Sequence, residues 1–300
     1  MKDPKTQYAL KGQNQKLSAH APGYRSAWAR LRKSQRSLGG LAILLILALI
    51  AAFAPSIAPH SPVTVDILNM FAPPSTSHLL GTDEAGRDVL SRLIFGARTS
   101  LLVGMLAMSI AILMGTIIGG VSGYYGSVID SVLMRFTDAM MSIPLYFLWI
   151  TILTIIGPSF LHVLFVLGFT NWMRVARIVR GDTLKYREFD FVTASLALGS
   201  PHYRILVWHV LPNVMPSVTV AASFGVARAI MAEAALSFLG LGVQPPTPSW
   251  GNMLMDAQTY IWNAPLLVVL PGLCIFITVV AFSMVGEGIR ISLDPTLVGR

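Results

Sequence analysis

Residues 187–212 read REFDFVTASLALGSPHYRILVWHVLP and form a polar, punctuated stretch between two strongly apolar runs. The apolar-rich part, residues 189–198, ends at Gly199, where a helix C-terminus favours a residue that tolerates positive φ. Ser200 is a candidate N-cap, and Pro201 fits the first position of a following helix, where its missing N–H costs nothing. The stretch therefore predicts a helix, a tight turn and a second helix.

The composition around this stretch is that of a membrane protein. The 300 residues are 54% hydrophobic and only 12% charged, whereas soluble domains carry roughly 25% charged residues. The net charge of +8 comes largely from the N-terminal tail and the region of the quoted stretch, which favours a membrane-topology signal over a nucleic-acid surface. Cys274 is the one cysteine, so an internal disulfide is excluded.

Apolar runs near the ~20 residues needed to cross a bilayer predict an all-α membrane protein with six transmembrane helices. Five segments are expected: a basic tail (1–37), a first anchor helix (38–58), an extracytoplasmic segment with an amphipathic helix (59–98), a five-helix core (99–286) and a C-terminal tail (287–300). The core helices are expected at residues 99–121, 139–156, 159–173, 214–238 and 264–285. Gly115, Gly119 and Gly123 predict close helix packing, and Thr82 or Asp83 is the expected cap of the amphipathic helix.

The distribution of basic residues predicts the orientation. Nine Lys or Arg lie in the tail, Arg135 lies in the second loop, six lie between Arg174 and Arg204, and two lie near the C-terminus. The opposite loops hold only Arg87, Arg92 and Arg98. Since cytoplasmic loops carry the excess of Lys and Arg, both termini and residues 187–212 are expected in the cytoplasm.

Few residues offer chemistry. There is no G-x-x-x-x-G-K-[ST] phosphate-binding loop, no catalytic triad can be assembled, and the histidines suggest no metal site; His202 and His209 are expected to be interfacial. Arg228 and Glu233 are the ionisable residues placed inside a predicted span, where charge is costly and usually faces a cavity or a partner. Each is expected either to line a translocation path or to form a buried structural pair.

The spacing within residues 187–212 resembles a known motif. Thr193-Ala194-Ser195, Gly199 and the HVLP of residues 209–212 are similar to the EAA loop, E-A-A-x3-G-x9-I-x-L-P, of the permease subunits of ATP-binding-cassette (ABC) importers. Thr193 stands in place of the Glu and His209 in place of the Ile. Six blocks extend the resemblance to the second (C-type) permease of the dipeptide, oligopeptide and nickel importers: GTDEAGRDVLSR from Gly81, GARTSLLVG from Gly96, MRFTDAMMSIP from Met134, residues 191–213, LSFLGLGVQPPTPSWG from Leu236 and GEGIRISLDP from Gly286.

This resemblance implies a type I ABC importer permease fold and a non-catalytic subunit of the bacterial inner membrane. The implied partners are a homologous permease, two ABC ATPase subunits that bind ATP and Mg, and an extracytoplasmic substrate-binding protein; no cofactor or metal is expected in this chain. Di- and oligopeptides are the expected cargo, with nickel, glutathione, opines or oligosaccharides as alternatives. A stand-alone secondary transporter is the alternative from a different class.

The resemblance also assigns expected roles to residues. The ATPase-coupling set is Phe189, Asp190, Phe191, Val192, Thr193, Ala194, Ser195 and Gly199. Phe189, Phe191 and Val192 are expected as buried anchors in an ATPase groove, and the missing glutamate at Thr193 removes one acid from that contact. On the outer side, Arg87, Asp88 and Trp250 are expected to receive the binding protein or gate the path, with simple capping of the bundle as the alternative.

Overall fold

The computed structural model describes residues 34–293, and all regular structure within that range is helical apart from one isolated bridge between Thr82 and Asp88. Most of the predicted basic tail (1–33) and residues 294–300 lie outside the described residues. The α-helices are α3 (Gln35–Ala52), α4 (Ala54–Ile57), α5 (Val89–Tyr125), α6 (Ser127–Met141), α7 (Leu145–Ile156), α8 (Phe160–Tyr186), α9 (Asp190–Ala197), α10 (His202–Ile205), α11 (Leu211–Phe238), α12 (Trp250–Ala257) and α13 (Leu266–Leu293). Short 3-10 turns lie at Ile67–Asn69 and Gln258–Tyr260, and a π-helical turn lies at Leu206–Val210.

The predicted count of six spans is approximate. Four elements of the described chain are long and apolar enough to cross a membrane: α3, α5, the continuous helix from His202 to Phe238, and α13. The predicted third span is instead two helices, α6 and α7, which meet at a bend of 79°. Pro144 causes the break, because it cannot donate a backbone hydrogen bond and disfavours helical geometry in the residue before it. Helix α8 packs lengthwise on α5, but its arginines make it less apolar than the others.

The prediction of a separate amphipathic helix within residues 59–98 is wrong, because the α-helical residues of that segment are the first turns of α5. Asp88, rather than Thr82 or Asp83, caps the helix by accepting the N–H of Ser91 at 2.8 Å, and α5 then continues unbroken for 37 residues. Asp83 caps a turn instead, because its carboxylate accepts the backbone N–H groups of Ala85 and Arg87. The apolar side chains expected on one face of that helix are nevertheless largely buried along the first turns of α5, at Val89, Leu93 and Ile94.

Close packing at the predicted glycines is confirmed. A Cβ atom added at Gly115 would lie 2.5 Å from the Val175 side chain, and one at Gly119 would lie 2.3 Å from the carbonyl oxygen of Ala176. A Cβ at Gly123 would approach the carbonyl oxygen of Arg180 to 2.8 Å. These glycines let the backbones of α5 and α8 approach each other directly, as small residues do in membrane bundles.

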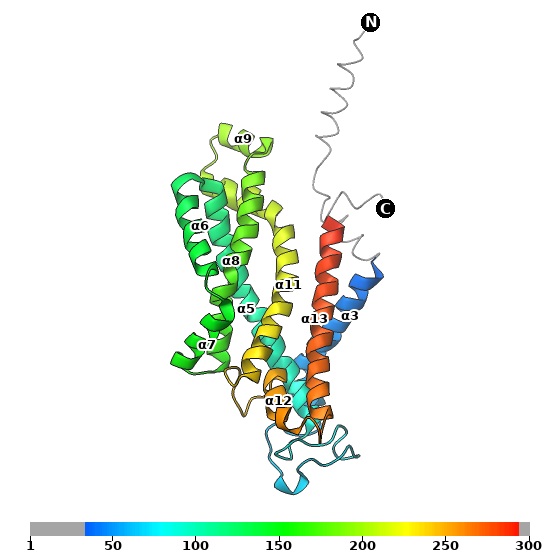
Figure 1. Cartoon of the computed structure of the whole chain (residues 1–300). Helices are drawn as coiled ribbons and strands as arrows, with labels where there is room; N and C mark the ends of the chain where they lie inside the picture. Colours follow the sequence, from blue (N-terminus) through cyan, green and yellow to red (C-terminus); the bar gives the residue numbers. More distant parts are fainter. Residues whose placement is uncertain (1–33, 294–300) are drawn as a thin grey trace.

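The bundle has two distinct ends. Helix α9 and the C-terminal end of α13 lie at one end, whereas α12 and the loop before α5 lie at the other (Figure 1). Helices α5, α8 and α11 form the centre, with α6 and α7 on one side and α13 with α3 on the other (Figure 1). The start of α3 packs tightly on α13, since a Cβ at Gly40 would lie 2.8 Å from the carbonyl oxygen of Ala281. The quoted stretch therefore projects from one end of the bundle.

Candidate coupling loop and translocation path

Helix α9 is a short helix closed by a well-defined turn. Asp190 lies in its first turn, where negative charge complements the helix dipole. At its end, Gly199 has the predicted positive φ of 79°, and its N–H donates to the carbonyl of Leu196 while that of Ser200 donates to the carbonyl of Ser195. This is a Schellman turn. The N-cap of α10 falls on Pro201, one residue later than predicted.

The two faces of α9 differ. Val192 is buried within its own chain, in the cluster that includes Val179 and Ile205, and Phe191 packs against that cluster. Phe189 stacks edge-on against Tyr186, with 5.3 Å between ring centroids, and remains partly exposed. Val192 thus ties α9 to the bundle and is not available as an anchor for another protein. The outward face carries Asp190, Thr193, Ala194, Leu196, Ala197 and Leu198.

The base of α9 is braced by contacts between helix ends. The Arg187 guanidinium donates to the carbonyl oxygen of Gly123 at 3.0 Å, which joins the end of α8 to α5. The Tyr124 hydroxyl lies 3.1 Å from Nδ1 of His202, which joins α5 to α10. Farther down α8, Arg180 makes a two-pronged contact with Asp130 of α6, at 2.5 and 2.6 Å. The frame under α9 is therefore built from four helices.

A single continuous helix leads away from the Gly199 turn. It begins at His202, passes through the π-helical turn at Leu206–Val210 and runs on as α11 to Phe238. This π-helical turn lies directly before Pro212. In a regular α-helix the proline ring would clash with the carbonyl group four residues earlier, and the wider turn relieves this clash. At 1.5 Å per residue, His202 is connected to Arg228 by about 40 Å of helix.

Arg228 and Arg174 line two adjoining cavities. The first, of about 430 Å³, lies between α7, α8 and α11, and the second, of about 540 Å³, lies between α8, α11 and α13. Both volumes are in the range of small-molecule pockets. Among the described residues, neither cavity is lined by a carboxylate and neither arginine forms an ion pair. The path-lining alternative for Arg228 therefore has a cavity to support it, and Arg174, which sequence reasoning counted only as a topology signal, joins it.

Glu233 lies outside both cavities and is fully buried. Its carboxylate accepts the hydroxyl of Ser237 at 2.7 Å and that of Ser100, on α5, at 3.3 Å. Ser100 in turn accepts the backbone N–H of Trp250 at 3.3 Å, and Ser237 accepts that of Val243 at 3.2 Å. Glu233 thus joins α5, α11 and the start of α12, which supports the structural alternative for this residue.

At the end of the bundle that carries α12, Arg87 sits in an ion-pair network. It bonds Asp83 at 2.7 Å, contacts Glu84, and reaches Asp256 of α12 at 3.2 Å; Arg92 also pairs with Asp256, at 3.1 Å. Burial, with the neighbouring Asp83 carboxylate, raises the pKa of Glu84. Burial opposes the charge on Arg87, but the surrounding carboxylates outweigh it and raise the pKa of Arg87. The network joins the loop before α5 to α12.

Trp250 and Asp88 are both buried, and each has a structural partner. The Trp250 indole donates to the carbonyl oxygen of Leu93 at 3.1 Å and packs against Gly96. For Asp88, burial favours the neutral form, but hydrogen bonds from His78 and Ser91 outweigh it and lower the pKa of Asp88. These contacts account for capping of the bundle; a role in receiving a binding protein stays a prediction.

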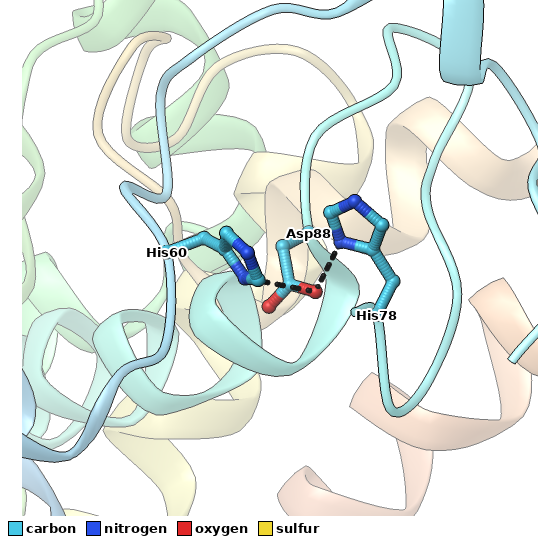
Figure 2. Close-up of side chains that lie close together, drawn as sticks. All are labelled: His60, His78 and Asp88. Carbon is cyan, nitrogen blue, oxygen red and sulfur yellow. Dashed lines mark hydrogen bonds and ion pairs between the residues drawn. The ribbon is translucent and has the colours of Figure 1, made fainter. Parts of the chain in front are cut away.

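Sequence reasoning found no set of metal ligands, yet His60, His78 and Asp88 converge before α5 (Figure 2). Their nearest ligand atoms all lie within 4.8 Å of one another. The three residues are far apart in the sequence and follow no ligand spacing, and only the folding of the loop onto the start of α5 brings them together. These three residues do not follow the regular spacing by which metal ligands are recognised in a sequence.

Comparison with known proteins gives matches over most of the chain. Residues 111–298 match the family described as binding-protein-dependent transport system inner membrane component, and residues 24–74 match the N-terminal transmembrane domain of oligopeptide transport permease C. The dipeptide transport system permease protein DppC of Alkalihalophilus pseudofirmus is 39% identical over 91% of this chain and 90% of its own length. The nickel transport system permease protein NikC of Escherichia coli is 38% identical over 86% of this chain and 93% of its own.

The fold has a counterpart among solved structures. A chain of the MetNI methionine ABC transporter, in inward-facing conformations, superposes with a TM-score of 0.57 at 17% identity, covering 68% of this chain and 98% of that one. At 17% identity, this similarity supports the fold of the chain and not its function. The predicted all-α permease fold is thereby confirmed.

Proposed function

Because the chain belongs to the family of inner membrane components of binding-protein-dependent transport systems, whose permease subunits do not themselves hydrolyse ATP, we propose that it imports peptides in an ATP-driven assembly. The assembly comprises this chain, a homologous permease, two ATPase subunits that bind ATP and Mg, and an extracytoplasmic binding protein. The assembly lies in the bacterial inner membrane, with both termini of this chain and α9 in the cytoplasm. The excess of Lys and Arg at the α9 end supports this orientation.

The observation that carries the proposal is the geometry of α9. Apart from Asp190 and Thr193, its outward face carries small and apolar side chains, and its base is braced by α5, α6 and α8. Such a face fits a groove on an ATPase, with Phe189, Leu196 and Leu198 as the apolar contacts and Thr193 and Ala194 allowing close approach. Val192 holds the helix to the bundle during the movement, so that α9 transmits force instead of detaching.

The route from α9 to the membrane interior is short and direct. Gly199 changes the chain direction once, and the continuous helix from His202 then reaches Arg228 at the two cavities. A rigid-body movement of α9 would tilt this helix and alter access to the cavities, as in other alternating-access transporters. The cavities are one wall of the path, which the homologous permease completes.

The arginines suggest what the cargo presents. Arg174 and Arg228 place two guanidinium groups at cavities lined by no carboxylate among the described residues, and guanidinium groups bind carboxylates with good geometry. A peptide supplies a terminal carboxylate. The dipeptide permease relative and the oligopeptide permease domain support peptides over nickel, to which the NikC relative points.

The coupling proposal is tested by co-purification with the ATPase subunits. Replacing Leu196 of α9 by Arg should abolish recovery of the ATPases with the permease pair, because a charge would be buried in an apolar contact. Leu68, which is 95% exposed at the other end, gives the matched control: Leu68→Arg should leave recovery unchanged. Normal recovery with Leu196→Arg would refute α9 as the docking element.

The cargo is tested through the substrate-binding protein of the proposed assembly. Calorimetry should show that it binds di- or oligopeptides, and those peptides should stimulate ATP hydrolysis by the reconstituted assembly. Binding of nickel, glutathione, opines or oligosaccharides in place of peptides would leave the permease assignment standing and replace the cargo.

A further inference from the structure

The cluster of His60, His78 and Asp88 has the arrangement of a metal site that is independent of the transport path. Oδ1 of Asp88 lies 2.9 Å from Nδ1 of His78 and 3.8 Å from Nδ1 of His60 (Figure 2). In a tetrahedral zinc site with bonds of 2.0–2.2 Å, neighbouring ligand atoms are separated by about 3.4 Å. The two observed separations lie on either side of that value, and all three ligand atoms lie within 4.8 Å of one another, so binding an ion requires small adjustments of the side chains.

Within the cluster, Nδ1 of His78 and Oδ1 of Asp88 share one hydrogen bond, which a bound metal ion would replace with a bond to each atom. Oδ2 of Asp88 accepts the N–H of Ser91 at 2.8 Å, which orients the carboxylate and points Oδ1 at the two rings. His78 alone reaches Oδ1 within hydrogen-bond distance, because the 3.8 Å separation of His60 is too long for a hydrogen bond. Among the described residues, the His60 ring has no hydrogen-bond partner, although its Nδ1 lies 3.8 Å from the Asp88 carboxylate.

Surrounding contacts hold the ligands in place. The backbone N–H of His60 donates to the Ser91 hydroxyl at 3.0 Å, which ties His60 to the first turn of α5. The backbone N–H of His78 donates to the Ser75 hydroxyl at 3.1 Å. The two rings lie 4.7 Å apart at 34° to each other. Such supporting contacts orient ligands in known metal sites.

We propose that His60, His78 and Asp88 bind one divalent transition-metal ion, such as Zn²⁺, which clamps the loop before α5 onto the start of that helix. Two imidazoles and one carboxylate suit zinc, nickel and cobalt better than magnesium or calcium. The Asp88 side chain is 1% exposed and that of His60 is 42% exposed, so the site is anchored on one side and open to solvent on the other. Water fills the remaining coordination position.

The test is a titration of the purified full-length chain in detergent, after treatment with a chelator, using Co²⁺ and its visible absorption as the probe. We expect Co²⁺ to bind at one saturable site and to give the visible absorption typical of tetrahedral Co²⁺. Added Zn²⁺ should displace the Co²⁺ and abolish this absorption. His60→Ala and His78→Ala should each weaken Co²⁺ binding by at least about tenfold. His209→Ala, at an exposed histidine in the π-helical turn Leu206–Val210, should leave binding unchanged.

A second measurement guards against a misfolded variant. Zn²⁺ should raise the Tm of the wild-type chain and slow proteolysis of residues 61–77, and it should do neither in His60→Ala, whose metal-free Tm should match the wild type. Asp88 is left intact because it caps α5. The proposal is overturned if no saturable binding occurs, if His60→Ala binds as tightly as wild type, or if His209→Ala weakens binding equally. Neither measurement needs an ATPase or cargo, so its outcome is separate from that of the transport proposal.

Discussion

Arg228 combines exposure to a cavity with a position in the candidate membrane span from His202 to Phe238, and Arg174 shares both cavities with it. A charge in that position is costly unless water, a partner or a ligand satisfies it. No carboxylate of the described residues lines the cavities, so the charges of the two arginines can be satisfied there by water or by the carboxylate of a bound cargo.

Arg228→Gln should therefore reduce peptide uptake by proteoliposomes containing the whole assembly by about tenfold or more, because a charge-assisted hydrogen bond contributes about 1.5–3 kcal/mol. Arg228→Lys should reduce uptake less, since lysine keeps the positive charge but lacks the planar guanidinium that binds a carboxylate through two hydrogen bonds. Arg135→Gln, at an exposed position on α6, is the control and should transport normally. Normal uptake by Arg228→Gln would exclude Arg228 from the path.

Glu233 is the opposite case, because its carboxylate is enclosed by hydroxyl groups and lines no cavity. Glu233→Ala should lower the stability of the chain by about 1–3 kcal/mol for each hydroxyl left unpaired, while Glu233→Gln, which can still accept from Ser237, should be milder. The measurement is the Tm of the purified chain beside its uptake rate. Loss of uptake at an unchanged Tm would contradict the structural role and support the alternative that Glu233 lines the translocation path.

At the scale of elements, the proposed coupling route runs from α9 through the turn at Gly199 into the helix from His202 to Phe238. The turn depends on a positive φ that other residues adopt at a cost of about 1–2 kcal/mol. A Cβ at Gly199 would meet nothing within 4 Å, so a substitution there strains the backbone without creating a clash.

Gly199→Val should uncouple the assembly: ATP hydrolysis continues while uptake falls, and the chain still assembles with its partners. Gly181→Val is the matched control, because Gly181 also has nothing within 4 Å of an added Cβ but lies within α8 without a positive φ. Equal uptake by the two variants would remove the Gly199 turn from the transmission route.

The α5–α8 interface makes a different demand on glycine. Gly119→Leu should destabilise the bundle by at least about 1–3 kcal/mol through overpacking, because its Cβ would lie 2.3 Å from the Ala176 carbonyl oxygen. Gly272→Leu, in α13 with open space around it, should be tolerated. Thermal unfolding of the purified chain distinguishes the two, and equal Tm values would contradict the packing described.

Local chemistry decided which of these features the sequence could predict. Gly199 and the glycines of α5 were predicted because turn geometry and helix packing restrict the residue type directly. The start of α5 was misplaced because Asp83 and Asp88 are equally good caps, and only the turn around Asp83 decides between them. The cavities and the His60 cluster were beyond prediction, since each joins side chains that become neighbours only after helices and loops pack.

At the scale of the whole molecule, the ends of the bundle face different compartments. Cys274 is the only cysteine of the chain, so Cys274→Ser gives a background for single-cysteine reporters. Leu68→Cys should react with a membrane-impermeant maleimide on intact spheroplasts, and Leu198→Cys, at a position 86% exposed on α9, should react only after lysis. The reverse pattern would invert the orientation.

The dependence of transport on ATPase subunits tests the central claim most directly. Liposomes are prepared with this chain alone, with both permeases, and with both permeases and both ATPases, and uptake of labelled peptide is measured with the binding protein present. The account predicts uptake only in the last preparation and only with ATP. Uptake driven by an ion gradient through this chain alone would contradict it and identify a stand-alone secondary transporter.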